Sequence, residues 1–168
     1  YSSPVSQQLG GIASSVSTTR NYTWESLAES LETAIDASLF GFTRTCMAAD
    51  LNFAKQAPNL ILRTASLAAL LPVAIIPYAI WGLNEKYTKP FCSLLKWRAE
   101  NGEYILSLAQ QGTTSAEPII RHLEYQFPRT GFTNAHDEFM LGPKWLVAPV
   151  VSDAGVRMVR LPKGRWKE

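Results

Sequence analysis

The sequence has few residues of the types that bind metals or form disulfides. Its 168 residues include only two cysteines, Cys46 and Cys92, and two histidines, His122 and His136. Two cysteines are too few for a disulfide scaffold, although they can form one bridge in a secreted chain; the alternative is two buried thiols. No Cys-x-x-Cys motif, His-rich cluster or glycine-rich phosphate loop is present. We therefore expect no metal and no cofactor.

An excess of charge of one sign is also missing. The sequence has 16 basic and 14 acidic residues, and the basic ones are scattered. A nucleic-acid-binding protein usually gathers them into a patch or stripe, so we expect no nucleic-acid partner. The apolar fraction of 46% is that of a globular chain with a core. The chain starts at Tyr1 without a signal-peptide pattern, which predicts a processed start or a segment of a longer protein.

One long stretch, residues 64–83, lacks charge altogether. Its 20 residues are long enough to span a bilayer as a helix. However, Pro72 and Pro77 would break such a helix. A helix that ends near Leu71, followed by a buried strand over residues 73–80, explains the same pattern, because strands buried on both faces are continuously apolar. We expect no membrane span; a small membrane-anchored protein remains the alternative.

Helix and strand signals alternate along the first three-quarters of the chain. Apolar residues recur every four positions over residues 24–39, which predicts an amphipathic helix. A short strand fits residues 42–47. Residues 88–110 predict one long helix that starts around Pro90 and ends at Gly112, with a strand after it over 118–125. This alternation indicates an α/β fold with a parallel sheet or barrel.

The last quarter of the chain has a different texture. Two short β-rich runs, residues 145–151 and 156–161, are separated by a turn-forming Ser-Asp-Ala-Gly segment. The pattern predicts a β-hairpin formed by these two runs.

Four motifs occur in order with short spacers toward the C-terminus. They are EPIIRHLEYQFP at 117–128, DEFMLG at 137–142, WLVAPV at 145–150 and LPKGRW at 161–166. In this order they resemble the end of the catalytic barrel and the following β-domain of glycoside hydrolase family 31. Further upstream the chain is similar to the branch of that family that includes the myogenesis-regulating glycosidase.

The resemblance implies a fold in two parts. Residues 1–130 would be the late strands and helices, the C-terminal part, of a (β/α)8 TIM barrel. Residues 131–168 would begin an antiparallel β-sandwich domain. Half a barrel leaves strand edges open. We therefore expect another polypeptide that supplies the rest of the barrel, or a homo-oligomer.

The resemblance also implies retaining hydrolysis or binding of α-glycosides. Such enzymes use two carboxylates, a nucleophile and a general acid/base. The family's nucleophile strand precedes the matched region, and Thr19 occupies the acid position, where a hydroxyl cannot replace a carboxylic acid. We expect the chain alone to be inactive. The alternative is a non-catalytic descendant with a structural, carbohydrate-binding or signalling role.

Three further residues are candidates for binding or modification. Asp50 resembles a family aspartate near the sugar site, although the paired glycines that follow it there are absent, and it can equally be a loop carboxylate or cap. Trp81 could stack on a sugar, or belong to the core. Asn21-Tyr-Thr is an N-glycosylation sequon, which favours a secreted or secretory-pathway protein. His122 stands where the family motif has proline and is expected to be a packing variant.

Overall fold

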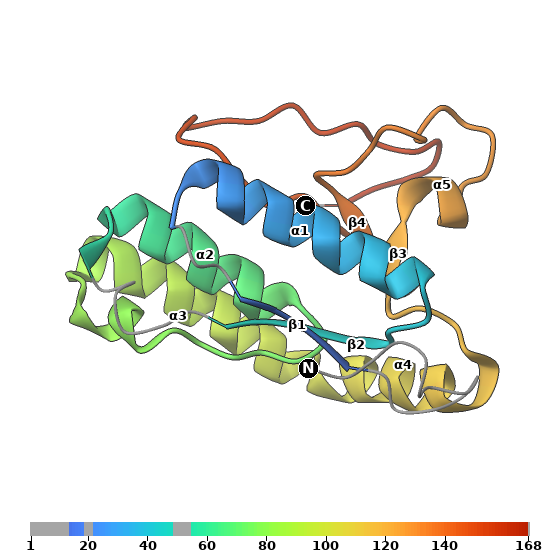
Figure 1. Cartoon of the computed structure of the whole chain (residues 1–168), viewed down its shortest axis with the longest axis horizontal. Helices are drawn as coiled ribbons and strands as arrows, with labels where there is room; N and C mark the ends of the chain where they lie inside the picture. The colour runs from blue at the N-terminus through green and yellow to red at the C-terminus, as the bar shows by residue number, and fades with distance from the viewer. Residues whose placement is uncertain (1–13, 19–21, 49–54, 168) are drawn as a thin grey trace.

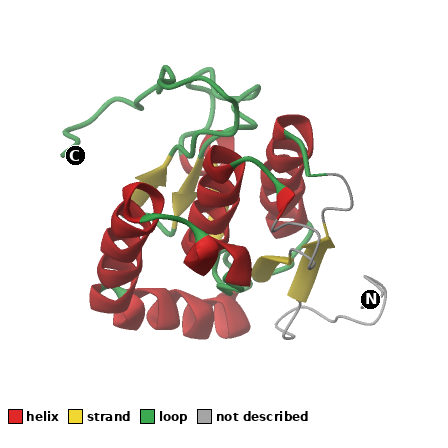
Figure 2. Cartoon of the chain, turned by 90° about the vertical axis from the view of Figure 1, so that its left-hand side faces the viewer, coloured by secondary structure: helices red, strands yellow, loops and turns green. Residues whose placement is uncertain are grey.

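The structure is a computed structural model that describes residues 14–18, 22–48 and 55–167 (Figure 1). Helices surround two small sheets, and the C-terminal residues run as a long loop along one side (Figure 2). The architecture combines a parallel strand pair with an antiparallel sheet, which agrees with the α/β class expected from the sequence.

The N-terminal unit is a strand, a crossover helix and a parallel strand. β1 (Ser14–Thr18) and β2 (Arg44–Ala48) pair in parallel, and α1 (Trp24–Leu39) connects them. The predicted helix over 24–39 is confirmed at both ends. Thr23 and Ser26 form a reciprocal capping box at its start, and Gly41, with a φ of +87°, follows its end.

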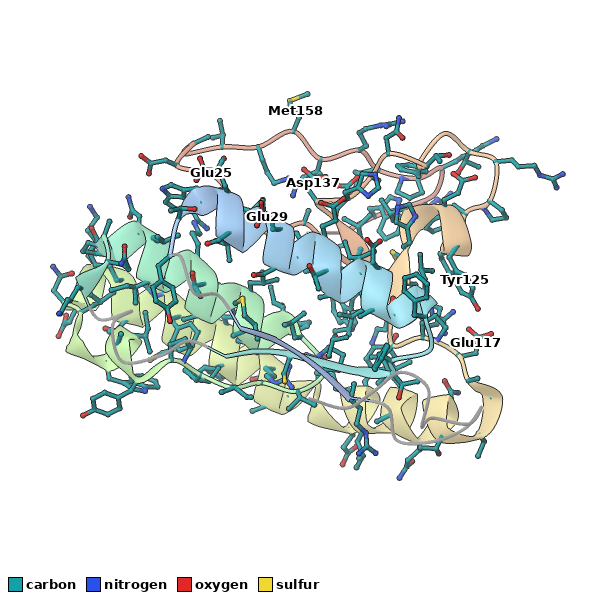
Figure 3. The ribbon with its side chains drawn as sticks, viewed as in Figure 1. Glu25, Glu29, Glu117, Tyr125, Asp137 and Met158 are labelled. Atoms are coloured by element: carbon teal, nitrogen blue, oxygen red, sulfur yellow. The ribbon has the colours of Figure 1, made fainter. Side chains whose placement is uncertain are left out.

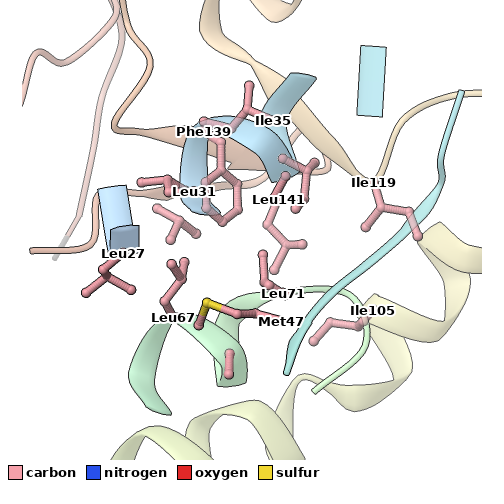
Figure 4. Packing of buried hydrophobic residues seen from close by; sticks show 14 of the residues in the cluster. Leu27, Leu31, Ile35, Met47, Leu67, Leu71, Ile105, Ile119, Phe139 and Leu141 are labelled. Carbon is pink, nitrogen blue, oxygen red and sulfur yellow. The ribbon is translucent and has the colours of Figure 1, made fainter. Parts of the chain in front are cut away.

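The main core lies between α1, α2 and the antiparallel sheet (Figure 4). Leu27, Leu31 and Ile35 form the buried face of α1, as the four-residue spacing predicts. They belong to one cluster with Met47 of β2 and residues of the antiparallel sheet, including Phe139. Burial of these side chains supplies the main driving force for joining the two sheets.

α2 (Pro58–Leu70) ends where the sequence predicts, but the strand expected after it does not form. Val73 donates one backbone hydrogen bond to the carbonyl of Thr45 in β2, at 3.2 Å. The chain then leaves β2 and forms a 3-10 helix, η3 (Tyr78–Gly82). Pro72 and Pro77 lack the N–H groups that a continuous ladder needs, which explains why the strand prediction for residues 73–80 is wrong.

The single long helix expected over residues 88–110 is also wrong. The structure has two helices, α3 (Glu85–Glu100) and α4 (Gly102–Ser115), which meet at Asn101. Pro90 lies inside α3 and not in its first turn. Gly112 lies inside α4, where an added Cβ would be 3.2 Å from Cγ2 of Thr43. This glycine therefore allows close packing and does not end the helix.

The second sheet is antiparallel, in the order β3 (Ile120–His122), β4 (Phe139–Leu141), β5 (Trp145–Val147). Only the middle of the predicted strand over 118–125 is extended, since α5 (Leu123–Gln126) follows at once. The predicted hairpin is wrong, because β5 pairs with β4, while residues 156–161 form no strand.

The uncharged stretch at 64–83 is divided between α2, a loop and η3. Among the described residues, no helix has both the length and the apolar character that crossing a membrane requires.

Candidate functional site

β1 and β2 end at the same edge of the parallel pair, with Thr18 opposite Ala48. In α/β sheets this carboxyl edge is where ligands usually bind. In the sequence, Thr19 directly follows β1, and Asp50 comes two residues after β2. Thr19, Asn21 and Asp50 lie outside the described residues, so their predicted roles in acid catalysis, glycosylation and sugar binding remain predictions.

Trp81 is the one predicted sugar-binding residue that the structure describes. It belongs to η3, and 46% of its surface is exposed. Its ring meets Phe91 of α3 edge-on, with the centroids 5.8 Å apart. One part of the indole is therefore held by α3, while the exposed part is available for stacking. Its role in substrate binding remains a prediction.

The two cysteines are not joined in the structure. Cys46 is buried in β2, whereas Cys92 is an exposed, free thiol on α3. Burial raises the pKa of Cys46, which makes its thiolate less accessible near neutral pH. Of the two thiols that were expected to be buried, Cys46 is buried and Cys92 is not.

Glu25 and Glu29 are exposed on α1 (Figure 3). Glu25 lies in the first turn, where hydrogen bonds from its own backbone N–H and from Thr23 lower its pKa. A general acid needs the opposite shift, so that its carboxyl stays protonated near neutral pH. Glu25 therefore suits stabilisation of the helix start and not proton donation.

One buried carboxylate was missed by the sequence analysis. Only 2% of Glu138 is exposed, and its Oε2 lies 3.2 Å from the Arg157 guanidinium. Arg157 also contacts the carboxylate of Asp137, at 2.9 Å, and donates to the carbonyl of Pro149, at 2.8 Å. The pKa of Glu138 is raised, because the effect of burial outweighs the opposing charge of Arg157. The group holds the C-terminal segment against β4. The acidic pair in the motif at 137–142 was the available signal.

The two histidines lie close together beside α1. His122 is buried, and its Nδ1 accepts a hydrogen bond from the backbone N–H of Glu124, at 3.0 Å. Its ring centroid is 5.8 Å from that of His136, which lies 3.6 Å from Glu32 of α1. The described residues contain no group of three or more His, Cys, Asp or Glu side chains that could hold a metal. The burial of His122 agrees with the predicted packing role.

Comparison with known proteins identifies the C-terminal part of the chain. Residues 116–168 match the family model described as Glycosyl hydrolase family 31 C-terminal domain. This match assigns residues 116–168 to the C-terminal domain of glycosyl hydrolase family 31. The resemblance seen in the four motifs is thereby confirmed.

Two curated relatives are alpha-glucosidases. That of Saccharolobus solfataricus is 34% identical over 85 residues, which are 50% of this chain and 12% of that protein. Alpha-glucosidase 2 of Bacillus thermoamyloliquefaciens is 28% identical over 88 residues, or 51% of this chain and 11% of the relative. The matched parts thus cover about an eighth of each relative's length.

Solved structures have the same fold. A GH31 alpha-xylosidase from a soil metagenome, complexed with xylose, gives a TM-score of 0.72 at 22% identity, covering 86% of this chain and 26% of its own. The GH31 alpha-xylosidase of Xanthomonas citri gives a TM-score of 0.73 at 23% identity. The match covers 85% of this chain and 18% of the xylosidase. An uncharacterized protein of Listeria monocytogenes, in complex with glucose, gives a TM-score of 0.76 at 22% identity. The match covers 90% of this chain and 16% of the Listeria protein.

The structure explains one glycine of the family 31 motifs. Gly142 follows β4 with a φ of +59°, and an added Cβ would lie 2.5 Å from the Tyr104 hydroxyl oxygen. That hydroxyl donates to the carbonyl of Leu141 and accepts from the backbone N–H of Lys144, both at 3.2 Å. Gly142 thus lets α4 pack directly on the β4–β5 turn.

Proposed function

We propose that this chain is part of a family 31 glycoside hydrolase-like protein that acts on or binds α-glycosides, and that the chain alone does not hydrolyse them. The observation that carries the proposal is the parallel β1–α1–β2 unit, followed in the same chain by the family's C-terminal domain match. The names of the relatives, alpha-glucosidases and alpha-xylosidases, support α-glycosides as the ligand class.

The proposed fold is a late portion of a (β/α)8 barrel over residues 1–130, followed by the start of a β-sandwich over residues 131–168. The parallel unit and the hydrogen bond from Val73 to β2 support the barrel portion. The antiparallel pairing of β4 with β5 supports the second part. β3 pairs with β4, so the two proposed parts share one sheet.

Lack of activity follows from the residues proposed for catalysis. Thr19 takes the acid position, and the nucleophile strand of the family precedes the matched region. General acid catalysis contributes about 10²–10⁴-fold, and loss of the nucleophile removes the covalent route. Asp50 would then contribute to sugar binding at the carboxyl edge of the strands, and Trp81 would contribute near that edge.

The proposed partner is a polypeptide segment that supplies the remaining barrel strands, with a homo-oligomer as the other arrangement. Among the described residues, β1 pairs only with β2, which leaves its second edge without a strand. An open parallel edge favours association with another strand.

A non-catalytic role is the second candidate, because the proposed alignment puts Thr19, which has no carboxylate, at the family's acid position. In that case the protein would keep the fold and the carbohydrate site, or serve a structural or signalling role, without turnover.

The test compares maltose with a nitrophenyl α-glucoside, on the chain alone and on the assembly purified from its native source. We expect no turnover by the chain alone. An assembly whose partner supplies the nucleophile should cleave only the nitrophenyl substrate, because its leaving group needs little protonation. Efficient hydrolysis of maltose would show that Thr19 is misplaced or that Asp50 donates the proton.

We further propose that the protein enters the secretory pathway and carries a glycan on Asn21, as the sequon suggests. Intact mass measured before and after glycosidase treatment of native material tests this directly. An unmodified Asn21 in a eukaryotic source would remove the residue-level support for this location.

A further inference from the structure

A pocket lies in the C-terminal part of the chain. Its volume is about 540 Å³, and it opens between the loop after α5 and the segment at residues 160–163. Phe127, Phe132, Arg160 and Lys163 contribute its distinctive side chains. Among the described residues, neither the parallel strands nor Trp81 lines this pocket.

Hydrogen bonds hold both walls of this pocket. The carboxylate of Glu124 accepts from the backbone N–H groups of Arg129 and Phe132. On the other wall, the indole N–H of Trp166 donates to the carbonyl of Pro162, at 2.8 Å. Arg160 joins the walls by donating to the carbonyl of Gly131, at 2.9 Å. A pocket formed by such loops needs little reordering to accept a ligand.

The lining combines aromatic surface with positive charge. The Arg160 guanidinium lies 5.1 Å from the centre of the Phe132 ring, and the Phe127 ring packs edge-on against Trp166, at 6.4 Å. The side chain of Lys163 is exposed. No carboxylate of the described residues lines the pocket, and the nearby Glu124 accepts hydrogen bonds from the backbone of its own loop. The pocket thus combines aromatic surface with two cations at its rim, which suits a ligand that joins a ring to an anionic group.

We propose that this pocket binds a small organic anion: an apolar or sugar ring that bears a carboxylate or a phosphate. The ring would contact Phe127 and Phe132, and the anionic group would lie between Arg160 and Lys163. The Phe-Pro at the end of the first motif (127–128) and the fourth motif, LPKGRW at 161–166, thereby acquire a ligand-binding role. The proposal depends on neither the barrel nor Thr19, so failure of the glycosidase proposal would leave it unaffected.

Ligand titration of the full chain, followed by NMR, tests the proposal with four probes. Benzoate, phenyl phosphate and glucuronate carry the anion, and benzamide is the neutral match to benzoate. For probes of this size we expect dissociation constants on the order of 1 mM, with shifts confined to the aromatic residues of the pocket. The ratio between benzoate and phenyl phosphate separates carboxylate from phosphate sources. Equal affinity for benzamide and benzoate would overturn the role of the two cations.

Two charge variants provide the matched comparison. Lys163→Met should weaken benzoate binding about fivefold, because it removes one exposed cation. Arg165→Met is the control, since Arg165 lies in the same turn, is exposed and does not line the pocket. Both variants should keep the amide spectrum of the parent chain outside this turn. Equal benzoate affinity in the two variants, or no binding of any anion to the parent chain, would overturn the proposal.

Discussion

At the scale of single residues, the clearest constraint is the contact between Gly142 and Tyr104. We predict that Gly142→Ala destabilises the chain by about 2–4 kcal/mol, since the methyl group would overlap the Tyr104 hydroxyl and strain a positive φ. Urea unfolding measures the change. Gly155→Ala is the control, because an added Cβ at that glycine has no atom within 4 Å. Equal stability of the two variants would contradict this packing.

His122 predicts a pH dependence of stability. Burial, followed by the charge of His136, lowers its pKa from 6.5, although Asp36 and Glu124 oppose the shift. The unfolded chain therefore takes up the proton first as the pH falls, and the free energy of unfolding should decline as the pH drops below about 6.5. The contribution of His122 to the free energy of unfolding is fully present above about pH 6.5. It is lost as the pH falls toward the lower pKa that His122 has in the folded chain.

The matched variant for this effect is His122→Asn, whose side-chain oxygen can replace Nδ1 as the acceptor for the Glu124 N–H. Unfolding free energies between about pH 7.5 and 5 should fall less steeply in the variant than in the parent chain. Identical slopes would show that His122 titrates alike in both states.

At the scale of helices and strands, one arginine joins two helices. Arg98 of α3 donates to the carbonyls of Ala69, Leu71 and Pro72 at the end of α2, over distances of 2.6, 2.9 and 3.0 Å. Arg98→Met should cost about 2–4 kcal/mol, because the carbonyls lose their charged donor. Amide exchange should accelerate most at the end of α2.

Lys96→Met is the control for Arg98, because Lys96 lies on the same helix, is 78% exposed and pairs only loosely with Glu100, at 4.0 Å. Its replacement should change stability by less than about 0.5 kcal/mol. A similar loss in both variants would show that the charge of α3, and not the contact with α2, matters.

At the scale of the whole chain, the exposed apolar residues of the C-terminal segment predict self-association. Val156 is 84% and Met158 91% exposed, and Met158 points away from the ribbon in Figure 3. Arg157 between them turns toward Asp137 and Glu138. The segment thus presents two large apolar side chains outward, and exposed apolar surface of this kind favours association.

Replacing both residues, Val156→Lys with Met158→Lys, should raise the monomer fraction of the chain in sedimentation experiments at high concentration. Phe40→Lys, at a residue that is 81% exposed beyond the end of α1, is the control for adding a lysine elsewhere. Equal monomer fractions in both variants would assign association to other surfaces, with the open edge of β1 the first to test.

The sequence alone determined the features that depend on neighbours along the chain. The helix over 24–39 was predictable from its apolar spacing, and the end of α2 from Pro72, because caps and periodicity act within a few residues. The family resemblance was predictable from four motifs in order. Thr19 and Asp50 were proposed from that resemblance alone, and Asn21 from its sequon.

Only the tertiary structure decided the contacts between distant segments. β5 pairs with β4 and not with residues 156–161, since Arg157 ties that segment to β4 and to Pro149. The burial of Glu138 depends on Arg157, which lies 19 positions later in the chain. The close packing at Gly142 depends on Tyr104, which lies 38 positions earlier. Local patterns carry no information on such contacts, because burial and pairing are set by which elements meet in space.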